Sequence, residues 1–347
     1  MTNNQKIPFF FIIGRPRSGT TLLRTMFDAH PNVCIPFECP MIINLHLKFK
    51  TVKKWTKEKK LSFYNSLFTQ WKFDSFRVNN DKLKTELLQL PEDCEFEDLI
   101  RKVYSNFNSV YEKEEILLFG DKNPEYSLNS FYINRLIKIF PNAKFIHLIR
   151  DYRDNFVSYK NVDFEAPVAP LIAYRWKNSV LSVEKIAKIY PQQFIIQRFE
   201  DLIAEPETNL QKLCAFLNLE FSTKMLDYKN KKQEFIETFP KEILEKYHSS
   251  TMGELDKSKI NAWQNKMTES EIKKSDYISG KTGEKFGYIR KYNKASISVI
   301  LKSLPWIIYG KLWMLLKWVI DHLPFKWRTA IIARGPVLAW VYNKIFR

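Results

Sequence analysis

The chain has 347 residues, of which 45% are hydrophobic and 27% charged, so a sizeable core can form and a disordered or collagen-like protein is excluded. The net charge of +17 favours anionic partners such as nucleotides, sulfated or phosphorylated substrates or anionic lipid. Four Cys without C-x-x-C spacing predict neither a disulfide framework nor a metal site, and they indicate a reducing compartment.

Buried strands and helices alternate along the chain. Apolar runs predict strands at 7–13, 116–119, 144–149 and 194–197. Helical periodicity predicts helices at 20–29, 131–140, 154–159, 171–190 and 206–217, and a mostly helical stretch at 41–115. This alternation is typical of an α/β fold with a parallel sheet, in which ligands bind where strands end and helices begin.

A glycine-rich turn, Gly14 to Thr21 (G-R-P-R-S-G-T-T), lies between the first predicted strand and helix. Its glycines allow a tight backbone, and N–H groups at a helix start attract an anion. The spacing matches a nucleotide-triphosphate loop, but Thr20 stands where such a loop has lysine, which disfavours a kinase or ATPase. The alternative is a strand–helix turn that binds no ligand.

The segment 15–23 (R-P-R-S-G-T-T-L-L) resembles the 5′-phosphosulfate loop of sulfotransferases that use 3′-phosphoadenosine 5′-phosphosulfate (PAPS). The following D-A-H-P at 28–31 is similar to the branch with tyrosylprotein sulfotransferases and many bacterial members. The resemblance implies a P-loop-like three-layer fold and PAPS as the donor. It also implies that the 5′-phosphosulfate is bound by Arg15, Arg17, Ser18, Gly19, Thr20 and Thr21.

A second anion site is predicted after the third strand. Arg150 ends that strand and Ser158 lies in the helix that follows, so a guanidinium and a hydroxyl can clamp one terminal phosphate. This pair resembles the family's 3′-phosphate site; a salt-bridged turn is the alternative.

Two later segments also resemble the family, and the matches together reach from about Phe9 to Tyr288. R-F-E-D-L at 198–202 is similar to an R-Y-E-D-L segment, which implies a contact between the Phe199 ring and adenine. The stretch 249–263 resembles a donor-capping loop, which implies donor contacts from Ser250 and Lys257. It departs from the pattern at Asn261, where glycine is usual.

Two residues are candidates for the chemistry. Glu38 lies just beyond the first helix, in I-P-F-E-C-P, and the resemblance implies that it is the general base. Lys122, in G-D-K-N-P, matches the family's D-K-x-P lysine and would stabilise charge on the bridging oxygen. His248 is the rival base. A sulfuryl group carries less charge than a phosphoryl group, and no metal-carboxylate motif stands out, so we expect no metal.

The last part of the chain is basic and aromatic. Beyond Lys285, eleven basic residues face one acid, Asp321, and five Trp lie among Ile and Leu. This composition favours helices in a membrane interface with anionic lipid, while Pro305, Gly310 and the nearby lysines argue against an ordinary spanning helix. A tail packed on the catalytic domain and an oligomer contact stay open as alternatives.

The sequence thus predicts a sulfotransferase domain over 1–292, with an acceptor-side helical insert at 41–115, and a basic tail over 293–347. We expect sulfuryl transfer from PAPS to a hydroxyl or amine, with a lipid or a glycan as candidate acceptor. Pro40 replaces the basic residue of tyrosylprotein enzymes, which disfavours a protein tyrosine. A kinase-like phosphotransferase and a non-enzymatic membrane- or polyanion-binding protein are the alternatives.

The apolar stretch before Gly14 is too short for a signal sequence. We therefore expect no N-terminal export signal, a cytoplasmic protein that attaches peripherally to the inner membrane face, and no nucleic-acid partner.

Overall fold

The computed structural model describes residues 6–162, 165–231 and 255–333. Its centre is a sheet of five parallel strands in the order β2-β3-β1-β4-β5. The strands are β1 (Phe9–Ile13), β2 (Val33–Cys34), β3 (Leu118–Lys122), β4 (Lys144–Ile149) and β5 (Phe194–Arg198). All five residues of β1 are buried, as expected for a central strand covered on both faces. The predicted α/β fold with a parallel sheet is therefore confirmed.

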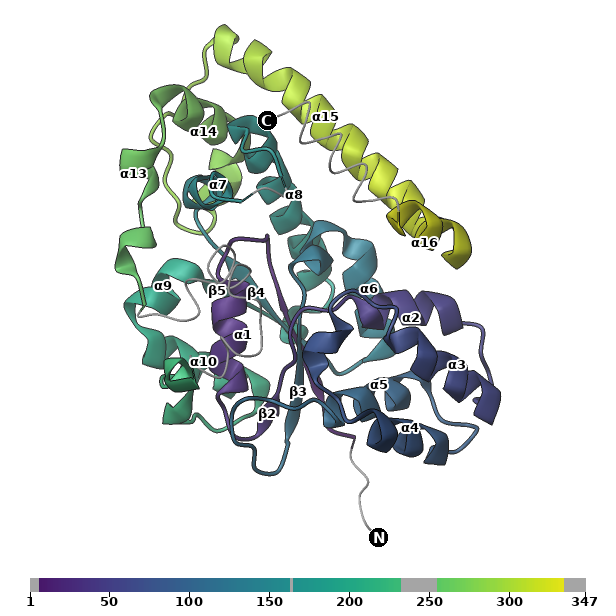
Figure 1. The fold of residues 1–347 in the computed structure, drawn as a ribbon. Coiled ribbons are helices and arrows are strands. Elements are labelled where there is room, and N and C mark those ends of the chain that lie inside the picture. Colours follow the sequence, from purple (N-terminus) through teal and green to yellow (C-terminus); the bar gives the residue numbers. More distant parts are fainter. Residues whose placement is uncertain (1–5, 163–164, 232–254, 334–347) are drawn as a thin grey trace.

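Helices cover both faces of the sheet (Figure 1). Because successive strand residues point to opposite faces, Phe9 and Phe11 enter one core and Phe10 and Ile12 the other. The first core is closed by α2 to α6 and part of α8, the second by α1, α9 and α10. These helices are α1 (Thr20–Asp28), α6 (Ser130–Ile139), α8 (Ala169–Ala187), α9 (Phe199–Ala204) and α10 (Pro206–Leu217).

The stretch predicted to be mostly helical contains four α-helices and then an irregular segment. The helices are α2 (Met41–Phe49), α3 (Lys57–Leu67), α4 (Asn80–Gln89) and α5 (Phe96–Ser105), with a short 3₁₀ helix η1 (Phe73–Phe76). The Asn79 side chain accepts a hydrogen bond from the Lys82 N–H at 3.0 Å, which explains why α4 begins after it. The limits of the domain, the insert and the tail stay a prediction.

The strand after the insert differs from its predicted position. The sequence predicts 116–119 with a turn at 120–124, whereas β3 runs to Lys122. Gly120 is a residue of β3, and a Cβ there would lie 2.5 Å from the Phe10 ring, so close packing requires glycine at this position. The two-residue strand β2 is too short to be recognised from a pattern.

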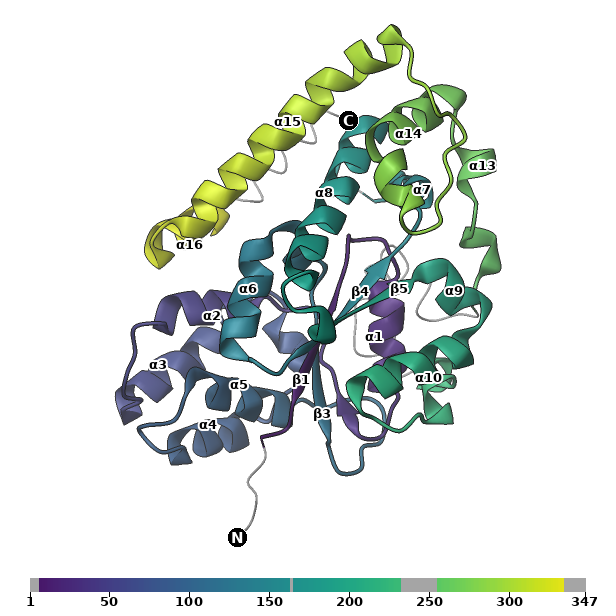
Figure 2. The same ribbon diagram turned by 180° about the vertical axis from the view of Figure 1, so that it is seen from behind.

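The C-terminal helices lie around α7 (Tyr152–Tyr159) and α8, with α13 and α14 on one side and the long α15 on the other (Figures 1 and 2). They are α13 (Trp263–Lys266), α14 (Glu269–Glu284), α15 (Ile297–His322) and α16 (Phe325–Ala333). Helix α14 packs on α7 and α8, and α15 packs on α8. A Cβ on Gly310 would lie 2.6 Å from the Tyr174 ring, so glycine allows α15 to approach α8 closely.

Helix α15 continues without a break through Pro305 and Gly310, two of the residues that argue against an ordinary membrane-spanning helix. Pro305 has no N–H group, so the carbonyl of Leu301 lacks its usual helical hydrogen bond. Leu301 is exposed, and water can reach this carbonyl. Among the described residues, α15 is the one helix whose length and composition would allow it to cross a membrane, and most of it is not buried.

Candidate active site

The glycine-rich loop lies at the carboxyl end of β1 and is fixed by buried contacts. Gly19 has φ 92°, and a Cβ there would lie 2.5 Å from the Phe199 ring, so this backbone needs glycine. From α7, the Asn155 amide donates to the Pro16 carbonyl at 2.9 Å and to the Ser18 hydroxyl at 3.3 Å. Helix α1 begins directly after Gly19, so the unpaired N–H groups of its first turn face the loop.

The loop's other predicted ligands differ in exposure. Thr20 is buried at the first position of α1, and Thr21 is half-buried beside it. Arg15 is engaged elsewhere, because its Nη2 lies 2.5 Å from the Glu165 carboxylate and its guanidinium lies over the Tyr159 ring. Burial is the largest influence and opposes the charge on Arg15, but Glu165, with smaller effects of Tyr159 and Glu125, raises the pKa of Arg15 overall. The part of Arg15 in donor binding stays a prediction.

The second predicted anion site joins the loop directly. The Arg150 guanidinium donates to the Arg17 carbonyl at 3.2 Å and to the Lys259 carbonyl at 2.8 Å, and it lies over the Phe199 ring. The Arg17 Nε donates to the Ser158 hydroxyl at 3.1 Å. The two predicted sites therefore meet at Arg17. Burial lowers the pKa of Arg150, and its Nε has no hydrogen-bond partner among the described residues.

A carboxylate holds the segment around Asn261 across the strand ends. Asp154 accepts the N–H groups of Asn261 and Trp263, each at 2.8 Å, and burial raises the pKa of Asp154 to about 6. Asn261 has φ 57°, a left-handed backbone that favours glycine, which matches the glycine usual at this place. The side chain of Lys257 is exposed in η7 (Lys257–Lys259), and Ser250 lies outside the described residues, as does His248.

Glu38 and Lys122 form an ion pair at the same end of the sheet. Their Oε2 and Nζ atoms are 2.6 Å apart; the Lys122 side chain is buried, and that of Glu38 is 22% exposed. Lys122 is the last residue of β3 and pairs in register with Ile12 of β1, so it lies beside the loop. The structure thus brings together the two side chains that the sequence predicts for catalysis.

Arg24 is a site residue that the sequence analysis missed. It is fully buried on α1, where its Nη2 lies 3.0 Å from the Asp28 carboxylate and donates to the Ile35 carbonyl, while its Nε donates to the Pro36 carbonyl at 3.2 Å. Burial lowers the pKa of Arg24. Because these carbonyls precede Glu38 by only two or three residues, Arg24 fixes the segment that carries Glu38. Its signal was an arginine within the apolar face of a helix.

Two more charged groups surround the pair. Asp121, next to Lys122, is buried, and burial raises the pKa of Asp121 to about 7. Lys72 comes from the helical insert, where burial lowers its pKa and the charge of Glu38 opposes that shift. Neither residue is among those predicted for the site: Asp121 appears there only as part of the G-D-K-N-P motif, and Lys72 is far from both members of the pair in sequence.

The described histidines are engaged or buried. His147 is buried in β4, and burial lowers the pKa of His147 to about 3. His30 Nε2 lies 2.8 Å from the Glu220 carbonyl. Within the described residues, no group of three or more His, Cys, Asp or Glu is placed to hold a metal ion.

The model of the family described as the sulfotransferase family matches residues 8–223, more than half of the chain. The chain belongs to the sulfotransferase family. The predicted family and the enzyme class, a sulfotransferase, are thereby confirmed. The matched stretch contains the loop, Glu38, Lys122, Arg150 and Phe199, and it ends before α14 and α15.

The curated relatives have low sequence identity to this chain, but the similarity extends over more than 60% of its length. The chain is 26% identical over 229 residues to a protein named as a putative protein-tyrosine sulfotransferase of Caenorhabditis briggsae, covering 63% of this chain and 68% of that one. It is 26% identical over 230 residues to protein-tyrosine sulfotransferase 1 of Danio rerio, covering 65% of this chain and 57% of that one.

Solved structures agree on the fold. The sulfotransferase domain of the olefin synthase of Synechococcus PCC 7002 superposes with a TM-score of 0.56 at 20% identity. The superposition covers 83% of this chain and 98% of that domain. This likeness confirms the three-layer, P-loop-like fold.

Proposed function

We propose that this chain moves the sulfuryl group of PAPS, the donor of the family that the sequence resembles, to a hydroxyl or amine of an acceptor, without a metal ion. The observation that carries the proposal is the junction at Arg17, where Arg150, Ser158 and the loop meet beside the Glu38–Lys122 pair. A donor with phosphate groups at its 3′ and 5′ positions fits two adjoining cationic sites better than a single-phosphate ligand does.

Donor binding divides between the two sites. In our proposal the 5′-phosphosulfate lies at the N-terminus of α1, with Arg17, Ser18, Thr20 and Thr21, where unpaired N–H groups attract an anion. Arg150 and Ser158 bind the 3′-phosphate. The Arg150 Nε has no hydrogen-bond partner among the described residues and is available to donate to it.

Other segments would complete the donor site. The Phe199 ring, packed between Gly19 and Arg150, offers an edge to adenine. Lys257 and Ser250 belong to the segment that would cover the donor, and Asp154 ties that segment to α7.

The transfer needs a base and a stabilised leaving group. The acceptor oxygen forms a bond to sulfur while the bond between sulfur and the bridging oxygen breaks, which leaves adenosine 3′,5′-bisphosphate and a sulfate ester. Glu38 takes the acceptor proton, and the Lys122 ammonium stabilises the charge on the bridging oxygen. Positioning in line supplies most of the remaining rate enhancement.

We expect this chain to differ from its named relatives in the acceptor that it uses. Those relatives are named as protein-tyrosine sulfotransferases, so a protein tyrosine is the second candidate. Pro40, in place of a basic residue near the base, removes a contact for acidic peptide, and we therefore favour a lipid or glycan hydroxyl.

We also propose that the protein is cytoplasmic and attaches to the inner membrane face through α15. The outer face of this helix exposes a row of apolar side chains at a helical spacing: Ile297, Leu301, Leu304, Ile308, Leu312, Leu315 and Val319. Lys302 and Lys311 are exposed beside this row and carry the charge that anionic lipid attracts.

Thermal unfolding tests the donor part of the proposal. Adenosine 3′,5′-bisphosphate should raise the melting temperature without Mg²⁺, whereas ATP with Mg²⁺ should not. Stabilisation by Mg²⁺-ATP alone would support the kinase-like alternative instead. Glu38→Gln should keep the bisphosphate shift and lose transfer of label from ³⁵S-PAPS to acceptors in a cell extract; full transfer by that variant would exclude Glu38 as the base.

A further inference from the structure

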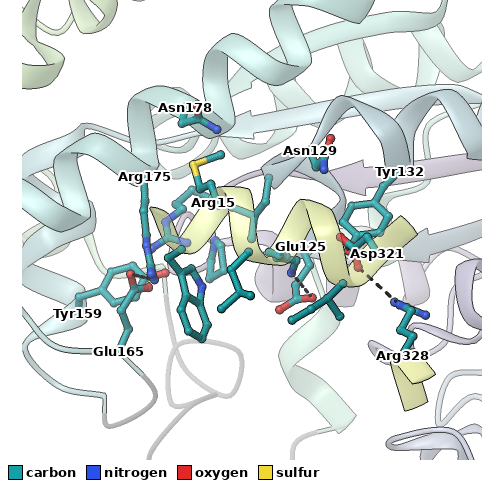
Figure 3. A pocket seen from close by; sticks show the side chains of 17 residues that line it. Arg15, Glu125, Asn129, Tyr132, Tyr159, Glu165, Arg175, Asn178, Asp321 and Arg328 are labelled. Carbon is teal, nitrogen blue, oxygen red and sulfur yellow. Dashed lines mark hydrogen bonds and ion pairs between the residues drawn. The ribbon is translucent and has the colours of Figure 1, made fainter. Parts of the chain in front are cut away.

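A cavity of about 450 Å³ lies between α15 and the rest of the protein (Figure 3). Its floor includes Arg15 and Pro16 of the loop, Glu125 and Leu128 of the 3₁₀ helix η2 (Pro124–Leu128), and Arg175 of α8. Helix α15 closes it from outside with Trp313, Met314, Leu316, Lys317 and Ile320. No lining residue comes from the insert at 41–115, which the sequence analysis assigns to the acceptor pocket.

The two walls of the cavity differ in chemistry. The α15 side is mainly apolar, whereas the opposite side holds Arg15 and Arg175, which share the Glu165 carboxylate, as Figure 3 shows at one end. Arg15 is 4% exposed, and its Nε has no hydrogen-bond partner among the described residues. The Arg175 Nε is buried and likewise unpartnered in the described part of the chain. Such donors need an acceptor group from a ligand or water.

The cavity borders the loop proposed to bind the 5′-phosphosulfate, because Arg15 and Pro16 of that loop line it. Glu125, another lining residue, follows Lys122 by three residues along the chain. The cavity therefore touches the donor side of the protein at the loop.

Two polar contacts hold α15 over the cavity, and a third joins α15 to α16. The Lys317 Nζ lies 3.2 Å from a Glu125 carboxylate oxygen, and the Lys317 charge lowers the pKa of Glu125. The Tyr132 hydroxyl donates to the Asp321 carboxylate, and the Arg328 Nε lies 3.5 Å from that same carboxylate. Figure 3 shows this second group at the end of the cavity opposite Arg15.

We propose that this cavity is the acceptor site and that the acceptor is an amphiphile with an apolar chain and a terminal hydroxyl. The chain packs against Met314 and Leu128, and the hydroxyl end points past Arg15 toward the loop, where Glu38 would take its proton. A volume of about 450 Å³ is in the range of small-molecule sites. The inference rests on the proposed sulfotransferase function, and the membrane-facing outer side of α15 gives such an acceptor a source.

The cavity offers a direct binding test with 11-bromo-1-undecanol as the probe, because its bromine quenches a tryptophan that it touches. The Trp313 signal is the difference in fluorescence between the protein and its Trp313→Phe variant. Quenching of this signal should increase with probe concentration and reach a plateau. Met314→Phe and Leu128→Phe, which add volume on opposite walls, should each raise the half-quenching concentration at least tenfold. Leu315→Phe, on the exposed face of the same helix, should change it less than twofold.

The outcomes separate the two proposals. If the bisphosphate stabilises the protein and all three variants quench alike, the probe lies on the outer face of α15 and the cavity proposal is wrong. If the bisphosphate does not stabilise the protein, the proposed function is wrong, whatever the probe does. The cavity variants should leave the bisphosphate shift intact, and in the labelled-donor assay they should raise the KM for 1-decanol tenfold with little change in kcat.

Discussion

The loop from Gly14 to Thr21 and helix α15 border the same cavity but are held in different ways. The loop is fixed by buried hydrogen bonds from Asn155 and Arg150 and by close contacts at Gly19. Helix α15 is joined to the body of the protein by the Lys317–Glu125 ion pair, the Tyr132–Asp321 hydrogen bond and a close approach at Gly310, and it exposes apolar side chains on its other face. The family match includes the loop and ends before α15. The difference suggests a donor site common to the family and an acceptor side particular to this chain.

The largest effect is expected at the Glu38–Lys122 pair, which we propose is catalytic. Lys122→Met should lower kcat by about 10²- to 10³-fold, because a charge aimed at the leaving oxygen is lost, while adenosine 3′,5′-bisphosphate still binds. Single-turnover transfer from PAPS, with calorimetry of bisphosphate binding, measures both. A proportional loss of bisphosphate affinity would assign Lys122 to donor binding instead.

The next effect concerns the junction of the two anion sites. Arg150→Ala should weaken bisphosphate binding about 100-fold, since two or more charge-assisted hydrogen bonds are removed. Isothermal calorimetry without Mg²⁺ checks this value. Lys138→Ala, which removes an exposed charge on α6, is the control and should leave the affinity unchanged.

Arg24 tests whether the base is held from α1. Arg24→Met should lower the free energy of unfolding by about 3 kcal/mol, because it leaves Asp28 without one of its buried partners. It should also lower kcat more than bisphosphate affinity, since the segment before Glu38 loses two hydrogen bonds. Urea unfolding and steady-state kinetics measure the two effects. If the variant has the same kcat as the unsubstituted protein, measured below the melting temperature of the variant, Arg24 has a structural role alone.

Asp154 should make stability depend on pH. Its folded pKa of about 6 lies above the unfolded value near 4, so the folded state holds the proton more tightly. The contribution of Asp154 to stability is therefore greatest below about pH 4 and falls by up to about 3 kcal/mol as the pH rises to about 6. Urea unfolding across this window should show a smaller decline for Asp154→Asn. An identical decline in both proteins would contradict this cause.

The smallest effect on the fold is expected at the exposed face of α15. Leu301→Asp with Leu312→Asp should change the free energy of unfolding by less than about 0.5 kcal/mol, because both residues are exposed. The double variant should lose sedimentation with vesicles that contain phosphatidylserine. Retained sedimentation would place the membrane contact elsewhere or remove it.

Much of the donor side could be predicted from the sequence. The loop, Arg150 and Lys122 each follow a strand end, and parallel strands bring their carboxyl ends to one edge, so local patterns were sufficient. The strand boundary at Gly120 could not be predicted, because glycine there serves the packing of Phe10 and not a turn.

The acceptor side depends on contacts that no local pattern records. Lys317 meets Glu125 and Asp321 meets Tyr132 across nearly 190 residues of sequence or more. Pro305 lies at an exposed position and Gly310 at a contact between helices, and neither breaks α15. The cavity exists only because these distant segments come together.

Helix α1 would both bind the donor and hold the segment that carries Glu38. Its first turn would receive the phosphosulfate, and Arg24, five residues beyond Gly19, grips the chain just before Glu38. At 1.5 Å per residue, the two points are about 8 Å apart along one rigid rod. In the proposed mechanism a single helical length sets the spacing between sulfur and base, so inserting or deleting one residue between Thr21 and Arg24 should uncouple turnover from donor affinity.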